Sequence, residues 1–227
     1  MNLAALFSGG KDSTYAIYKA KLNDNNIKCA LTIFPKSYES KFLHYPNIQI
    51  TKLQTLSMKI SHIFHQTNSD DVETETNDLE NLINQAKKDF DIEGVVHGGI
   101  LSEFQKNRFE TVCDKLHLKV ISPLWRTDQK KYMKDLIDSK FKFIITSVTS
   151  EGLDDSWLGK EITTDDINKL DGLSKKYGFN LSFEGGEAET LVLNCPLFSS
   201  PIRIIKSKKI WDGYRGRFEI TEAILDK

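Results

Sequence analysis

A short apolar run that ends in a pair of glycines opens this chain and constrains its fold more than any other feature. Residues 3–7 (LAALF) are followed by residues 8–13 (SGGKDS) and then by helix-compatible residues, which predicts a strand, a tight loop and a helix. Glycine lets the backbone turn sharply and come close to a ligand. The N–H groups of such a loop form an anion site, to which the serine hydroxyls and the lysine charge add. We therefore predict phosphate binding at residues 8–13.

Strand-like and helix-like segments alternate from this loop up to residue 148. Apolar runs typical of buried strands lie at 27–34, 60–65, 95–96, 118–121 and 141–148, and the clearest helical periodicity lies at 79–90. The alternation predicts an α/β fold with a mostly parallel, doubly wound sheet. Ligands of such sheets bind beyond the carboxyl ends of the strands, where the loop at residues 8–13 lies.

The pattern changes after residue 148. A helix is expected at 164–177, with Thr163 or Thr164 as its N-cap, and short strands at 180–183, 191–193, 202–205 and 217–220. We read this part as a smaller α+β domain that closes over the nucleotide edge. The predicted domains are 1–148, which binds ATP, and 149–227, which carries the substrate and ammonia site. The polar, acidic stretch at 67–78 is expected to be a mobile loop.

Composition excludes several classes of protein. The 227 residues include 31 Lys and Arg against 32 Asp and Glu, a net charge of −1, so a bulk attraction to nucleic acid is not expected. No apolar run is long enough to span a membrane. Cys29, Cys113 and Cys195 are scattered and form no CxxC pair, which argues against zinc or redox sites and favours a cytoplasmic location.

A second unusual segment covers residues 184–190 (EGGEAET), with three carboxylates and two glycines. Carboxylates this close raise each other's pKa unless a cation or a hydrogen-bond donor compensates. Mg²⁺, ammonium, Lys11 and Arg108 are candidate compensators. A charged hairpin turn on the surface is the other reading of the same residues.

These motifs carry a family resemblance. Residues 8–13 resemble the SGGxDS loop of the PP-loop ATP pyrophosphatases, in the adenine nucleotide alpha-hydrolase-like superfamily. Together with EGGExET at 184–190 they resemble the diphthine–ammonia ligase family. Further similar stretches follow in the same order at 40–47, 98–110, 123–125, 152–160 and 191–198. Gly99 and Ala188 depart from the family pattern, where alanine and an aromatic residue are common.

The resemblance implies a HUP/Rossmann-like PP-loop domain and an ATP-dependent amide ligase with ATP and Mg²⁺ as cofactors. Such enzymes convert diphthine on translation elongation factor 2 to diphthamide, through an acyl-adenylate and with ammonia as the donor. Two alternatives remain at this point: a PP-loop enzyme with another acceptor, such as a tRNA base, and a non-catalytic, ATP-binding regulatory protein. Neither the metal ligands nor the oligomeric state is assigned.

The resemblance also implies roles for individual residues. Those expected to bind ATP are Ser8, Gly9, Gly10, Lys11, Asp12 and Ser13. Those expected to take part in catalysis are Glu184, Glu187, Glu189 and Arg108. Those expected to bind the substrate are His44, Gly98, Ser102, Gln105, Gly186 and Thr190.

Overall fold

A computed structural model describes residues 1–34, 47–69 and 71–226. The first part of the chain contains β1 (Asn2–Leu6), α1 (Lys11–Leu22), β2 (Asn26–Phe34), a 3-10 turn η1 (Ile48–Ile50), α2 (Thr51–Met58), β3 (Ser61–Gln66), α3 (Val72–Phe90), β4 (Gly94–Val96), α4 (Glu103–Lys115) and β5 (Lys119–Ile121). The second part contains α5 (Gln129–Asp138), β6 (Lys142–Val148), η2 (Asp155–Trp157), α6 (Thr164–Tyr177), β7 (Ala188–Asn194), β8 (Ile202–Trp211) and β9 (Gly216–Leu225).

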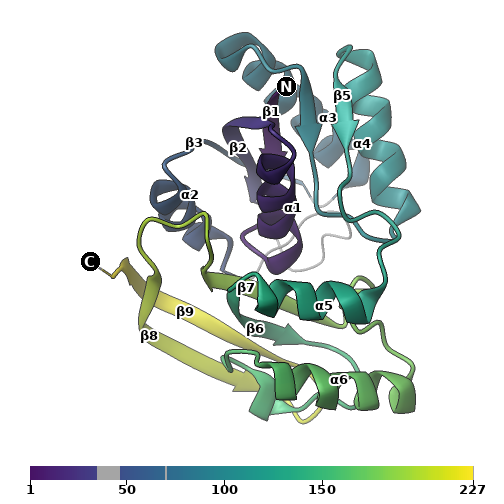
Figure 1. The fold of residues 1–227 in the computed structure, drawn as a ribbon, viewed down its shortest axis with the longest axis vertical. Coiled ribbons are helices and arrows are strands. Elements are labelled where there is room, and N and C mark those ends of the chain that lie inside the picture. The colour runs from purple at the N-terminus through teal and green to yellow at the C-terminus, as the bar shows by residue number, and fades with distance from the viewer. Residues whose placement is uncertain (35–46, 70, 227) are drawn as a thin grey trace.

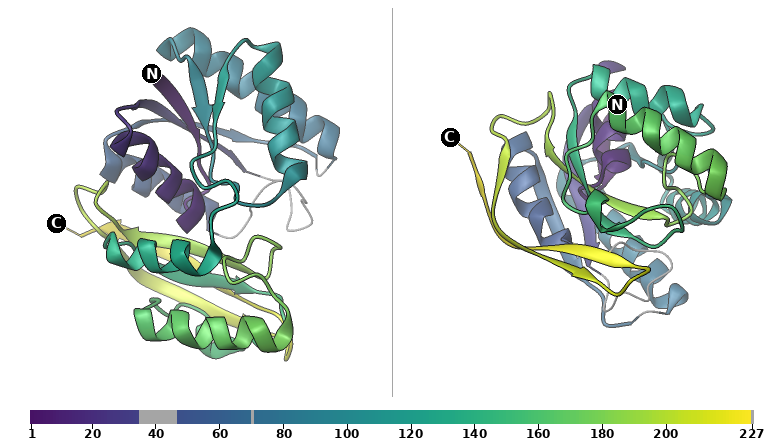
Figure 2. Two further views of the ribbon diagram at one scale, coloured as in Figure 1. Left: turned by 45° about the vertical axis from the view of Figure 1, so that its right-hand side comes forward. Right: turned by 90° about the horizontal axis from the view of Figure 1, so that it is seen from below.

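Two sheets organise the molecule (Figure 1). The first has the strand order β3-β2-β1-β4-β5, and all its pairs are parallel. Helices α1 and α2 lie on one face and α3 and α4 on the other (Figure 2). This confirms the predicted α/β class and doubly wound sheet. Strand order reverses between β1 and β4, which creates the crevice where such sheets bind ligands.

The second sheet has the order β7-β6-β9-β8 and is antiparallel. The apolar run at 141–148 was expected in the parallel sheet, but as β6 it pairs with β7 and β9. Residues 180–183, expected to be a strand, form turns instead. The proposed domain boundary at residue 148 thus falls at the end of β6, within the second sheet, and the division into domains stays a proposal.

Local signals explain where several helices begin. Thr163, one of the two residues predicted as N-cap, caps α6, and it does so through a capping box with Asp166. Helix α3 begins at Val72, because Asp71 accepts a hydrogen bond from the Thr74 N–H at 2.9 Å. The expectation of a mobile loop over 67–78 was therefore wrong from residue 72 onward. No helix in the described residues is long and apolar enough to cross a membrane.

Helix α1 packs against both parts of the molecule. The ring of Tyr15 lies 5.6 Å from that of Tyr132 on α5 and 5.2 Å from that of Phe141, just before β6. Ala16 and Ile17 are buried in the same core cluster. The loop that precedes α1 is thereby fixed at the junction of the two sheets.

Candidate active site

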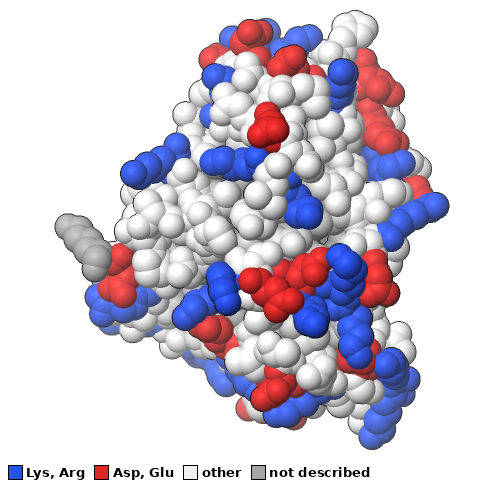
Figure 3. Space-filling view, in the orientation of Figure 1, with Lys and Arg blue, Asp and Glu red and all other residues white. Residues whose placement is uncertain are grey.

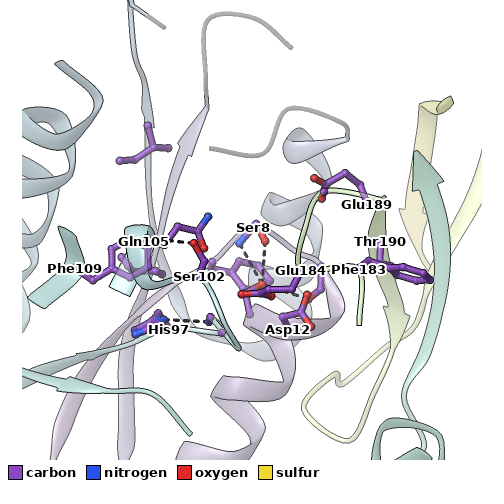
Figure 4. A pocket seen from close by; sticks show the side chains of 18 of the residues that line it. Ser8, Asp12, His97, Ser102, Gln105, Phe109, Phe183, Glu184, Glu189 and Thr190 are labelled. Atoms are coloured by element: carbon purple, nitrogen blue, oxygen red, sulfur yellow. Dashed lines mark hydrogen bonds between the residues drawn. The ribbon is translucent and has the colours of Figure 1, made fainter. Parts of the chain in front are cut away.

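One pocket of about 510 Å³ lies at the reversal point of the first sheet. Its walls come from the loop after β1, the loop after β4 and the segment 183–190 that leads into β7 (Figure 4). The residues predicted from sequence that line it are Ser8, Gly10, Asp12, Ser13, Gly98, Ser102, Gln105, Glu184, Gly186, Glu189 and Thr190. Segments more than 80 residues apart in sequence (Ile100 and Glu184 differ by 84) thus meet in one site.

The loop at residues 8–13 is compact and built around its glycines. Gly9 has a φ of +80°, which residues with a side chain rarely adopt. Gly10 is the N-cap of α1, and no side chain caps the helix. The Ser8 N–H donates to Ser13 Oγ at 3.3 Å, and the two serine hydroxyls lie 3.2 Å apart. The loop therefore places hydroxyls beside the first amides of a helix, an arrangement suited to an anion.

Lys11 and Asp12, in the first turn of α1, form an ion pair in which Lys11 is buried and Asp12 is partly exposed. Lys11 is 1% exposed, and its Nζ donates to both oxygens of Asp12, at 3.0 and 2.9 Å, and to the Ser182 carbonyl at 2.6 Å. These bonds occupy the three N–H donors of an ammonium. Tyr132 donates its hydroxyl to Asp12 at 2.6 Å, and burial, then the charge of Asp12, hold the pKa of Tyr132 well above its usual value. Asp12 thus serves this network and does not cap α1.

Glu184 joins the second part of the chain to the loop after β4. Its Oε1 accepts hydrogen bonds from the N–H groups of Ile100 at 2.8 Å and Leu101 at 3.2 Å. Burial, and next the negative charge of Asp12, raise the pKa of Glu184. Phe183, directly before it, is buried and has a φ of +62°, a strained conformation of the kind found at functional sites.

The other two carboxylates of the segment have different surroundings. Glu187 accepts from the Asn180 N–H and Nδ2 and from the Gly185 N–H, each at 2.8 Å, so its carboxylate closes the turn 180–187. Glu189 lies on β7 and lines the pocket (Figure 4). The reading of 184–190 as an ordinary surface hairpin is wrong, because Glu184 is largely buried against another segment.

His97 borders the pocket but is not placed to act as a base. It is 2% exposed, and burial lowers its pKa to about 4. Its Nδ1 accepts from the Gly99 N–H at 3.1 Å, so Nε2 carries the proton that reaches Ser122 Oγ at 2.6 Å. His97 therefore holds the loop after β4 in shape.

Four of the predicted site residues in the described part of the chain do not line the pocket. Gly9 and Lys11 lie behind it, and Glu187 lies within its own turn. Arg108, on α4, points to α3, where its Nη1 donates to Thr76 Oγ1 at 3.0 Å. His44 lies outside the described residues.

Sequence reasoning missed the apolar part of the pocket. It is lined by Leu6, Phe7, Leu31, Ile33, Leu79, Leu82 and Phe109, together with others. The first four lie at or near the carboxyl ends of β1 and β2. Their position at the strand ends could therefore have predicted that they line the ligand site. Apolar surface beside a polar loop suits a ligand with both characters.

The fold and the pocket define a two-sheet α/β protein with a glycine-loop ligand site at the carboxyl edge of its parallel sheet. Family models described as the diphthamide synthase N-terminal domain and C-terminal domain match residues 1–120 and 128–225. The chain belongs to the diphthamide synthase family and is an enzyme of the ligase class. Membership of this family implies the use of ATP.

Curated relatives agree over most of the chain. Proteins named diphthine–ammonia ligase are 33% identical in Mus musculus, over 92% of this chain and 85% of the relative, and 31% identical in Homo sapiens over the same shares. One from Schizosaccharomyces pombe is 31% identical over all of this chain but only 40% of its own length.

Proposed function

We propose that this enzyme converts diphthine on translation elongation factor 2 into diphthamide, with ATP consumed to AMP and pyrophosphate and ammonia as the nitrogen donor. The observation that supports this most is the meeting of the 8–13 loop with Glu184 and Glu189 in one pocket. Activation of the substrate carboxylate by ATP requires a loop that binds the phosphates. The attack of ammonia requires carboxylates that accept its protons. The names of the relatives supply the substrate class.

The chemistry has two steps. A carboxylate is a poor acyl donor, because oxide would have to leave. Its oxygen therefore first attacks the α-phosphorus of ATP; the bond from that phosphorus to the oxygen bridging to the β-phosphate breaks, and pyrophosphate leaves. Ammonia then attacks the carbonyl carbon of the acyl-adenylate, and the bond to AMP breaks. Loop amides and the hydroxyls of Ser8 and Ser13 would hold the pyrophosphate, and Ser102 and Gln105 would position the acyl group.

The proton balance assigns a role to the acidic segment. Ammonium must lose a proton before it attacks, and the tetrahedral adduct must lose another. Glu184 is suited to accept one, because a carboxylate with a raised pKa is a stronger base than an ordinary one. Glu189, across the pocket, is the second candidate.

Mg²⁺ fits this site only as an ion carried by the nucleotide. Within the described ranges no group of three or more His, Cys, Asp or Glu side chains could hold a metal. Mg²⁺ commonly needs only one or two carboxylates beside the phosphates of a substrate. Asp12, which lines the pocket at the start of α1, is the carboxylate that would hold it.

The remaining properties of the chain are compatible with a cytoplasmic protein that acts on another protein. Its cysteines are buried and unpaired, and burial raises the pKa of each thiol to about 12, so they are unreactive. Positive and negative side chains are interspersed over the face in Figure 3, which gives no support there to a nucleic-acid acceptor.

The nucleotide products test the first step. With α-labelled ATP, ammonium and diphthine-bearing elongation factor 2, we expect labelled AMP and one pyrophosphate for each turnover, and none without the factor. ADP and phosphate as products would exclude an adenylate. ATP binding without turnover would favour a regulatory role instead.

A further inference from the structure

Helix α2 carries buried polar side chains that the proposed chemistry does not use. Gln54 is 0% and Ser57 1% exposed. Buried polar groups need hydrogen-bond partners, and here the partners are backbone groups far along the chain. Ser57 Oγ donates to the Ser200 carbonyl at 2.5 Å and accepts from the Ser200 N–H at 3.1 Å. Polar side chains of α2 therefore connect the two parts of the molecule by hydrogen bonds.

The Gln54 carboxamide bridges the glycine loop and β7. Its Nε2 donates to the Gly9 carbonyl at 2.9 Å and to the Val192 carbonyl at 2.8 Å. The Val192 N–H donates to the same Gly9 carbonyl at 3.0 Å. Only the NH₂ side of a carboxamide can face two carbonyl oxygens, so this orientation of the amide follows from the chemistry.

Fixing the Gly9 carbonyl also fixes the next amide of the loop. The peptide between Gly9 and Gly10 is planar and trans, as the chain has no cis bond among its described residues, so its C=O and N–H point in opposite directions. With the carbonyl held toward Gln54 and Val192, the Gly10 N–H points away from both. Gly10 lines the pocket and Gln54 does not, so Gln54 would act on the pocket only through the loop.

The Gln54 carboxamide also leaves no room for a side chain at position 9. A Cβ on Gly9 would lie 2.3 Å from Gln54 Oε1. That oxygen is buried and has no hydrogen-bond partner in the described part of the chain. The carboxamide is thus placed to satisfy the two carbonyls at the expense of its own acceptor.

We propose that Gln54 is a positioning residue of the nucleotide site, which orients the Gly9–Gly10 peptide by tying it to β7. This inference rests on the proposed binding of ATP at residues 8–13. It predicts that loss of the two N–H donors weakens ATP binding even where the protein stays folded.

Two substitutions remove these donors. Gln54→Met keeps an unbranched side chain, and Gln54→Glu keeps the shape, so at least one folded variant is expected. The dissociation constant for ATP should rise about tenfold in the folded variants, the effect of about one hydrogen bond. Isothermal titration calorimetry at a temperature below every unfolding transition measures it.

Ser57→Ala is the matched control, because it breaks a buried bridge of the same helix that does not reach the glycine loop. Its melting temperature should fall while its affinity for ATP stays that of the wild type. A folded Gln54 variant that binds ATP as tightly as the wild type would overturn this inference but not the proposed function. The same would follow if Ser57→Ala lost as much affinity for ATP as the Gln54 variants. A wild-type protein that binds no ATP would overturn the proposed function as well.

Discussion

Glu184→Gln is expected to lower the rate of amide formation by about 10²- to 10⁴-fold, the usual contribution of a general base, without a loss of stability. The glutamine Oε1 can still accept from the N–H groups of Ile100 and Leu101, so the loop after β4 keeps its partner. Only the ability to take up a proton is removed. Rates with saturating ATP and ammonium, measured beside thermal unfolding, separate the two effects.

The pH dependence of stability gives this variant a second signature. Burial, and then the charge of Asp12, raise the pKa of Glu184 above its ordinary value of 4.5, so the folded state favours the protonated form. Its stabilising contribution is complete below pH 4.5 and is lost as the pH rises through the raised pKa. At pH 8 the neutral glutamine should therefore make the protein at least as stable as the wild type, and the difference should shrink toward pH 4.5.

Glu187→Gln provides the contrast. Both oxygens of Glu187 accept N–H groups within the turn 180–187, and an amide nitrogen cannot accept. This variant should lose thermal stability but lose less rate per folded molecule than Glu184→Gln. Full activity of Glu184→Gln would remove Glu184 from the proposed chemistry.

Gly98→Ala is expected to have the largest effect on the folded structure. Its Cβ would lie 2.5 Å from the Asp12 carbonyl carbon and 2.6 Å from the Ser13 nitrogen. These are backbone atoms in the first turn of α1, which cannot move aside as a flexible side chain can. We expect a loss of about 3 kcal/mol in unfolding free energy, or about 10 °C in melting temperature, and no measurable binding of ATP.

Gly172→Ala is the control for this substitution. Gly172 lies within α6, and its Cβ would meet nothing within 4 Å, so alanine should stabilise the helix by about 0.5–1 kcal/mol. Chemical denaturation and nucleotide titration of both variants give the comparison. An alanine at position 98 that left stability and ATP affinity unchanged would show that the loop after β4 does not abut α1 as described.

Features encoded locally could be predicted from the sequence. The glycine pair after an apolar run located the loop at 8–13, and the helix at 79–90 followed from its periodicity. The assignment of β6 could not be read in the same way, because KFIITSV is as apolar as a buried parallel strand. Its partners, β7 and β9, lie far along the chain, and pairing with them decides the sheet.

The roles of the acidic residues show a similar limit. The sequence predicted a shared catalytic role for Glu184, Glu187 and Glu189. In the fold, the turn 180–187 directs the carboxylate of Glu187 toward backbone N–H groups of the same turn. A glutamine in a short helix carries no signal at all, so Gln54 was not among the predicted site residues. Its importance depends on two carbonyls, those of Gly9 and Val192, that meet only in the fold.

The mass of the protein substrate tests the central claim most directly. The pure enzyme would be incubated with ATP, Mg²⁺, ammonium and elongation factor 2 verified to carry diphthine. We predict AMP together with a modified peptide about one mass unit lighter, because NH₂ replaces OH, and about one unit heavier again when ¹⁵N-ammonium is supplied. An unchanged mass, with the enzyme folded and the substrate verified, would contradict the proposed ligase function.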